Sequence, residues 1–251
     1  MGKQGGMGDG LLVDGFDLSG DTSSVTIASP MAVQDVTPIN AYGTARLGLV
    51  HDGALSWGAF WNPIGAPVGT AAHEVLRGLP MIDRTVTYLR STVLGAPAAS
   101  MLTKQIGYDP SRGNDGSLVL NVETQSNGYG IEWGAQLTAG LRTEAAAGNG
   151  PTVDLGALPV SYSFGWAAYL QVSALTGTSV TVKLQDSADG ATWADLAGAT
   201  FVAATGRGAQ RIASSTPTAT VRRYMRVVSA GTYTSAVYAV NFVRYEIGGH
   251  A

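Results

Sequence analysis

Short segments in which polar and apolar residues alternate, separated by turns of glycine, asparagine and aspartate, make up most of this sequence. In residues 179–185 the apolar residues share one face of an extended chain, because strand side chains alternate between two faces. That face holds Val180, Val182 and Leu184, and residues 164–172 repeat the pattern with Trp166, Ala168, Leu170 and Val172. Residues 84–90 place Val86 and Tyr88 together. The pattern predicts a mainly β protein.

The first half adds two further expectations. Residues 54–61 read as an aromatic-rich strand, and residues 69–78 as a short helix with Thr70 as its N-cap, Val75 and Leu76 on its apolar face and Gly78 as its end. Residues 99–106 and 117–124 predict a hairpin, with a long tip at 109–116. We therefore expect an antiparallel two-sheet sandwich or barrel with one flanking helix.

Composition changes once along the chain. Residues 143–151 combine small residues with Gly-Asn-Gly-Pro, which predicts a linker. Residues 1–10 predict a flexible glycine-rich arm. The expected domains are then residues 11–142 and residues 152–251, the second an independent all-β sandwich of the jelly-roll or immunoglobulin-like kind.

The charge content points to self-association. Only 13% of residues are charged, against about 25% in a usual soluble domain. So little charge predicts that copies of the chain cover part of its surface. The formal net charge of −3 argues against a surface that grips nucleic acid. We expect no signal peptide, no membrane-spanning segment and, with no cysteine, no disulfide.

Reactive groups do not gather into a catalytic or metal-binding pattern. His51, His73 and His250 are scattered and have no partners at metal-ligand spacing. The densest basic cluster, formed by Arg222, Arg223 and Arg226, is expected to pair with acids or face solvent. We expect no enzyme activity, no metal and no cofactor.

The aromatic residues of the second half leave an alternative open. Residues 187–193 resemble the Asp-box hairpin of sialidase-like propellers, one residue short, and predict a tight turn on which Trp193 packs. Trp166 is in phase with core positions, whereas Tyr169 lies on the opposite face. Tyr169 and Trp193 are therefore candidate glycan contacts, and a virion decoration protein or a host-surface adhesin is the alternative function.

Five stretches carry a family resemblance: residues 11–21, 52–60, 79–88, 105–117 and 125–134. Together they resemble the major tail (tail-tube) proteins of long-tailed, siphovirus-type bacteriophages, particularly those infecting actinobacteria. Residues 185–193 resemble the β-sandwich appendages of phage tail proteins. The resemblance implies a virion protein, assembled in the host cytoplasm, whose six-membered rings stack into a conduit for genome delivery. Its partners would be its own copies, other tail proteins and passing double-stranded DNA, bound without specificity.

The resemblance also directs attention to particular residues. We expect the first strand region to contribute to the assembly interface, through Asp14, Phe16, Asp17 and Leu18, together with Trp61. The hairpin strands are candidates for the inner wall of the tube, because long paired strands can join across a ring. Asn121 and Glu123 are the expected lumen residues, with Lys104 as a complication; a one-residue shift in register would exchange the two faces.

Overall fold

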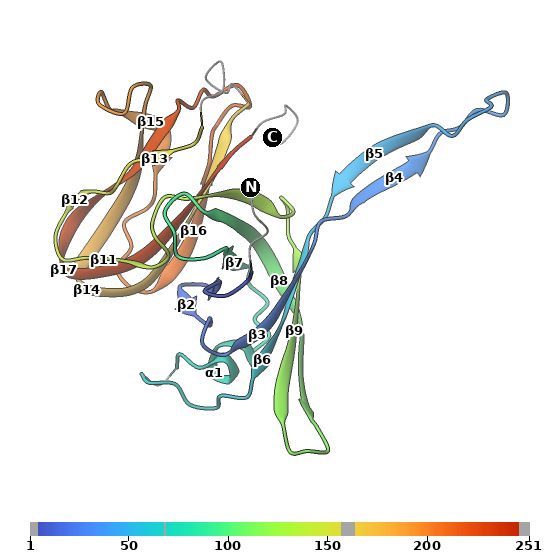
Figure 1. Cartoon of the computed structure of the whole chain (residues 1–251), viewed down its shortest axis with the longest axis horizontal. Coiled ribbons are helices and arrows are strands. Elements are labelled where there is room, and N and C mark those ends of the chain that lie inside the picture. The colour runs from blue at the N-terminus through green and yellow to red at the C-terminus, as the bar shows by residue number, and fades with distance from the viewer. Residues whose placement is uncertain (1–4, 68, 157–163, 246–251) are drawn as a thin grey trace.

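The computed structural model describes residues 5–67, 69–156 and 164–245, and confirms a mainly β protein with antiparallel strand pairing (Figure 1). A first half with one short helix packs against a second, all-β half, and a two-stranded hairpin projects away from both. The strands of the two halves belong to one connected sheet system.

The first half is built around the long strand β8, which pairs differently at its two ends. Its beginning pairs with β7 on one side and β10 on the other, and from Thr103 onward it pairs with β9. Strand β9 continues the sheet through β6 to β3, while β7 continues it through β1 to β2. The elements are β1 (Gly10–Val13), β2 (Phe16–Asp17), β3 (Thr22–Ala28), β4 (Met31–Asp35), β5 (Arg46–His51), β6 (Ala54–Phe60), α1 (Ala72–Leu76), β7 (Arg84–Leu89), β8 (Pro97–Arg112), β9 (Leu118–Ser126) and β10 (Glu132–Gln136).

The predicted hairpin is present, but its tip is shorter than expected. Strand β8 continues through Pro110 to Arg112, so residues 109–112 are paired with β9 rather than free. The turn itself closes with a hydrogen bond from the Gly113 amide to the Ser117 carbonyl, at 2.8 Å. Proline is tolerated in edge strands, and Pro110 lies in the part of β8 that has a neighbouring strand on one side only.

The helix has its expected apolar face but a different cap. Val75 and Leu76 are buried, as predicted, whereas the helix begins after Ala71 rather than Thr70. The Glu74 carboxylate accepts hydrogen bonds from the amides of Gly65, Gly69 and Ala71, which satisfies donors around the helix start. Thr70 instead donates its hydroxyl to the Pro67 carbonyl, so the N-cap prediction was wrong.

The second half depends on two very long strands, one of which joins both of the short strands predicted at residues 164–172 and 179–185. Strand β14 (Trp166–Ser187) pairs with β17 (Tyr224–Arg244) over its whole length, interrupted by bulges near Gly177. Both ends of β14 contribute to one core, so the pair must bend between them. Gly177 and Gly231 permit the bend: both have positive φ, and a Cβ on Gly231 would lie 2.3 Å from the Ser179 carbonyl oxygen.

The remaining strands of the second half flank this pair. They are β11 (Arg142–Glu144), β12 (Gly148–Asn149), β13 (Val153–Asp154), β15 (Ala194–Thr200) and β16 (Gly208–Ala213). The predicted inward residues of residues 164–172 and 179–185 all lie in this core, which confirms both alternation patterns.

The expected linker at residues 143–151 is not a free connection. The end of β11 and the whole of β12 lie within it and pair with β17. Glu144 is buried and accepts hydrogen bonds from Ser229 and Tyr233. The small residues of this segment do not prevent pairing, because the edge of β17 supplies the hydrogen-bond partners.

The contact between the two halves, which we call the seam, is polar and buried. Gln171 on β14 donates to the Thr85 carbonyl and the Thr87 hydroxyl, while its own side-chain oxygen accepts from the Gly15 amide. Asn241 on β17 donates to the Ser100 hydroxyl at 2.8 Å. Since β10 also pairs with β17, hydrogen bonds and strands both cross the seam.

Candidate assembly surfaces

One face of the sheet formed by β3, β6, β9 and the second part of β8 is exposed and polar. We call this four-stranded unit the open sheet. Its inner face supplies Leu55, Trp57, Leu120 and Val122 to the core of the first half. Cross-strand rows of the other face contain small or polar residues, such as Thr26, Ser56, Glu123 and Gly107 in one row, and Ser24, Gly58, Asn121 and Asp109 in the next.

Asn121 and Glu123 point outward, as the predicted alternation requires, because Leu120 and Val122 fill the core. Lys104, the expected complication, lies 2.7 Å from Asp83 and donates a hydrogen bond to the Met81 carbonyl. The hydrogen bond from Lys104 lowers the pKa of Asp83. The positive charge of Lys104 is thus compensated within the chain, and the exposed face keeps the acids Glu123 and Asp109.

The open sheet has two edges that no described strand covers. Strand β3 pairs only with β6, and β8 after Thr103 pairs only with β9. Uncovered edges present rows of unpaired backbone donors and acceptors, which readily accept another strand. The two edges lie on opposite sides of the same sheet. The β8 edge of each copy is therefore free to pair with the β3 edge of the next copy.

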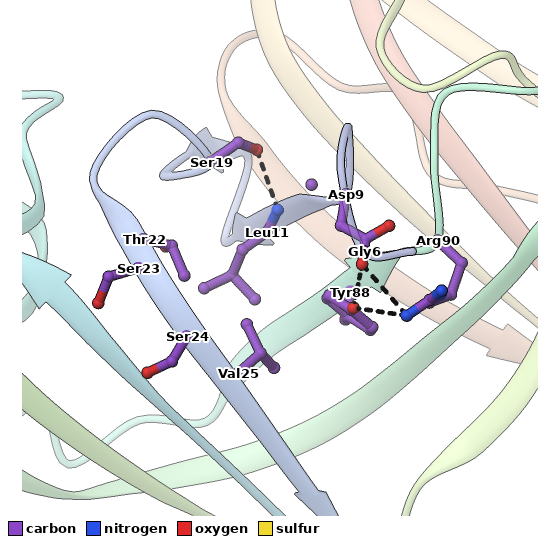
Figure 2. Close-up of a pocket in the computed structure, with 11 residues that line it drawn as sticks. Gly6, Asp9, Leu11, Ser19, Thr22, Ser23, Ser24, Val25, Tyr88 and Arg90 are labelled. Atoms are coloured by element: carbon purple, nitrogen blue, oxygen red, sulfur yellow. Dashed lines mark hydrogen bonds and ion pairs between the residues drawn. The ribbon is translucent and has the colours of Figure 1, made fainter. Parts of the chain in front are cut away.

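Beside the β3 edge lies a cavity of about 260 Å³, bounded by β1, β3 and β7. Figure 2 shows Thr22 and Val25 of β3 on one side and Tyr88 and Arg90 on the other. The far wall is held by Asp9, whose carboxylate accepts a hydrogen bond from Tyr88 and lies 3.3 Å from Arg90. Burial, and then the hydrogen bond to Asp9, raise the pKa of Tyr88. Asp9 thereby holds the end of the glycine-rich segment, residues 1–10, against its own chain.

The β8 edge instead carries protruding apolar side chains. Met81 and Ile82, in the segment that leads into β7, are 93% and 71% exposed, and Ile106 on β8 is 57% exposed. A bulge after Gln105 interrupts the pairing of β8 with β9 at this point. One edge of the open sheet therefore has a cavity and the other has projections.

A third surface is the projecting hairpin formed by β4 and β5, which we call the arm (residues 29–51). All 23 of its residues are exposed, and its two strands pair only with each other among the described strands. An isolated two-stranded hairpin is at best marginally stable in water. Yet it exposes eight large apolar side chains: Met31, Val33, Val36, Ile39, Tyr42, Leu47, Leu49 and Val50.

The arm was not predicted from the sequence. A signal was available, because apolar residues are frequent in residues 31–36 and again in residues 47–50, on either side of a turn segment with Pro38, Asn40 and Gly43. That pattern predicts a hairpin, but it does not reveal that neither face is covered.

The predicted interface residues of the first strand region are largely used within the chain. Leu18 is 1% exposed in the core, so its assignment to an assembly interface was wrong. The Asp14 carboxylate accepts a hydrogen bond from the Thr85 amide and lies 3.5 Å from Arg84. Burial nevertheless raises the pKa of Asp14.

The other predicted interface residues differ in exposure. Phe16 lies under the Arg207 guanidinium, 4.5 Å from its ring centre, in a contact between the two halves. Trp61 is half-buried against His73, with ring centres 4.4 Å apart. Asp17 is exposed and accepts hydrogen bonds from Ser19.

The two candidate glycan contacts do not form a surface platform. Tyr169 is fully buried and donates its hydroxyl to Glu132, so its expected surface position was wrong. Burial raises the pKa of the Tyr169 hydroxyl above its ordinary value. The Arg226 guanidinium, on β17, lies over the Trp193 ring at 4.3 Å from the ring centre. Trp166 is in the core, as predicted.

The arginine cluster behaves largely as expected. Arg223 lies 2.6 Å from Asp154, and Arg222 lies 3.8 Å from Asp186, while Arg226 donates to the Gln185 side chain. Within the described ranges, no group of three His, Asp or Glu side chains could hold a metal ion. His250 lies outside those ranges. None of the described helices is long and apolar enough to span a membrane.

Comparisons with known proteins give only weak likenesses. No family model and no curated protein matches the chain. A chain from the virion of a native gene transfer agent particle is 14% identical, with a TM-score of 0.39, over 50% of this chain and 95% of that chain. The SPP1 Dit protein is 10% identical, with a TM-score of 0.35, over 94% and 99% of the two chains. A phage P2 baseplate chain is 7% identical, with a TM-score of 0.35, over 96% and 100%. Such values are too low to assign a function.

Proposed function

We propose that the protein is a structural subunit of a bacteriophage tail, which joins copies of itself into stacked rings around a channel for DNA. The observation that supports this most directly is the open sheet, with two uncovered edges and an exposed polar face. The sequence resemblance to tail-tube proteins supplies the biological setting: six copies per ring, other tail proteins as partners and a place in the virion. The role requires no catalysis.

Ring closure would remove both uncovered edges. In our proposal, the β8 edge of one copy pairs with the β3 edge of the next, and the projections Met81, Ile82 and Ile106 enter the cavity of Figure 2. Such a contact uses different surfaces on the two copies, and it closes when the rotation between them completes a circle. A closed barrel has no free edges, which avoids uncontrolled aggregation.

The polar face of the open sheet would then line the channel. Each lysine or arginine that contacts a phosphate adds a salt-dependent attraction, which would retard passing DNA. Glu123 and Asp109 on this face repel phosphate instead, and the charge of Lys104 is compensated by Asp83. Small neighbours such as Gly58 and Gly107 keep the wall smooth.

The test is negative-stain electron microscopy and sedimentation of the purified full chain. We expect rings or tubes from the parent protein and monomers from the variant Met81→Lys/Ile106→Lys, because charge on the β8 edge would be buried unpaired. Val202→Lys is the matched control, since Val202 is 76% exposed in the second half. A parent protein that stays monomeric at high concentration would contradict the proposal.

A further inference from the structure

Asparagine is followed directly by glycine at two places in this chain, residues 127–128 and residues 149–150. This dipeptide is chemically labile, because glycine has no Cβ to hinder its own amide nitrogen from attacking the preceding side chain. The nitrogen bonds to the carbonyl carbon of the asparagine side chain, and the bond from that carbon to the side-chain amino group breaks. The amino group leaves as ammonia, with the proton that the glycine amide gives up. Water then opens the resulting cyclic imide to aspartate or isoaspartate.

The pair at residues 149–150 is protected from this reaction by strand pairing. Asn149 belongs to β12 and pairs with Val228 of β17, and the Gly150 amide donates a hydrogen bond to the Val227 carbonyl at 2.7 Å. Before its nitrogen can attack, that hydrogen bond must break and β12 must open locally from β17. The protection comes from the backbone, because the Asn149 side chain itself is exposed.

The pair at residues 127–128 has no such restraint. It follows the end of β9 at Ser126, and the Gly128 amide makes no hydrogen bond within the residues that the structure describes. The Asn127 side chain is exposed, and its amino group donates a hydrogen bond to the Asp83 carboxylate at 2.8 Å. That contact engages the group that leaves, and not the carbon that is attacked.

We propose that Asn127 is a site of spontaneous deamidation, at which the folded chain acquires aspartate and isoaspartate, while Asn149 is preserved. The two sites have the same dipeptide and exposed asparagine side chains. They differ in whether the attacking amide is held by a neighbouring strand, so the tertiary structure selects between them.

The reaction changes the charge of a cluster on the β8 edge. One oxygen of Asp83 lies 2.7 Å from the Lys104 ammonium and also accepts the hydrogen bond from Asn127. Asp83 and Lys104 compensate each other, so a carboxylate at residue 127 gives the cluster a net negative charge. It also replaces the donor to Asp83 by a second acceptor, and two neighbouring carboxylates repel.

The consequence for assembly rests on the proposed function. Lys104 donates a hydrogen bond to the Met81 carbonyl, and the Met81 side chain is one of the projections that we place in the neighbouring copy. A second carboxylate that competes for Lys104 would loosen this segment. Deamidation of Asn127 would therefore weaken the ring contact of chains that remain unassembled.

Mass spectrometry of the purified full chain tests the modification without any assembly. The chain is incubated at mildly alkaline pH, which favours loss of the amide proton, and the conversion of each asparagine is followed in peptides after proteolysis. We expect Asn127 to convert at least about tenfold faster than Asn149, because local opening must precede attack at the second site. In urea the two rates should converge. An intact Asn127, or equal rates in the folded chain, would overturn the inference.

A second experiment measures the effect on rings. Asn127→Asp places the product charge in the cluster, and Asn149→Asp is the matched control on β12. By sedimentation we expect Asn127→Asp to shift ring formation to higher protein concentration, and Asn149→Asp to match the parent. Ring formation by Asn127→Asp at the parent concentration would overturn the effect on assembly. If the parent forms no rings, the proposed function fails, whereas the conversion rates still decide the deamidation site on their own.

Discussion

Glu132 on β10 and Arg211 on β16 form a two-point ion pair, with N–O distances of 2.8 and 3.0 Å, inside the seam between the two halves. Tyr169 and Tyr245 also donate their hydroxyls to the same carboxylate. The Arg211 guanidinium is in turn covered by the Tyr129 ring, 3.5 Å from its centre. Four segments that are distant in sequence are thus fixed by one buried carboxylate.

Breaking this pair should be costly. We expect Glu132→Gln or Arg211→Met to lower the free energy of unfolding by about 3–5 kcal/mol, because the remaining partner keeps its buried polar group without compensation. Urea denaturation of each variant measures the loss. The matched control is Lys183→Met, which breaks the exposed ion pair with Asp195 and should cost at most about 1 kcal/mol. Equal losses in the two cases would show that the seam pair contributes no more than a surface pair.

The two halves should not separate cleanly. A chain that ends at Ala147 loses β17, the partner of β10, and exposes the buried polar groups of Thr87 and Ser100 that Gln171 and Asn241 now contact. We expect this truncation to be insoluble or to lack cooperative unfolding. Soluble expression and a thermal melt are the measurements. A soluble, assembling fragment would instead establish the independence that the sequence predicted.

The bend of the long strands should be sensitive to a single side chain. Gly231→Val adds a β-branched side chain at a φ of 126°, where its Cβ would meet the Ser179 carbonyl. We expect a loss of at least about 2 kcal/mol in the free energy of unfolding. Gly206→Ala is the control, because no heavy atom lies within 4 Å of the added Cβ. If Gly231→Val lowered the free energy of unfolding by no more than Gly206→Ala does, the backbone at the bend would accommodate the side chain without strain.

One ion pair should give a defined acid response. The hydrogen bond from Arg223 lowers the pKa of Asp154 from 3.8 to about 2. A carboxyl whose pKa is lower in the folded state stabilises that state above its unfolded value, and this contribution is lost as pH falls to the folded value. The stability difference between the parent and Asp154→Asn should therefore be constant above about pH 5 and shrink between about pH 4 and pH 2. Denaturation curves across this range measure it, and a difference that does not change with pH would contradict the assignment.

Reversing the charge at Glu123 should affect DNA passage rather than folding. Glu123 is exposed, so Glu123→Lys should change the free energy of unfolding by no more than about 0.5 kcal/mol. If the proposed tube is correct, we expect assembled tubes of normal appearance and slower DNA ejection from particles, because a lysine added to every copy along the channel would attract phosphate. A ring structure with Glu123 on the outer surface would remove the basis of this prediction.

The sequence alone determined which residues share a face. Alternation identified Val180, Val182 and Leu184, and likewise the outward positions of Asn121 and Glu123, because side chains of a strand alternate with a period of two. It could not determine how many layers cover each face. Tyr169 was expected at the surface because it opposes Trp166 and Leu170, yet the first half of the molecule covers that second face and buries it.

Only the tertiary structure decided the remaining features. Glycine-containing stretches that predicted turns became bends within β14 and β17, because each long strand pairs with the other on both sides of the bulge. The supposed linker became strands because β17 offered it an edge. The arm stayed exposed although it carries eight large apolar side chains, because burial depends on which distant segments pack against it. The alternation of polar and apolar residues does not encode which distant segments pair. The same long-range pairing also leaves the two edges of the open sheet uncovered.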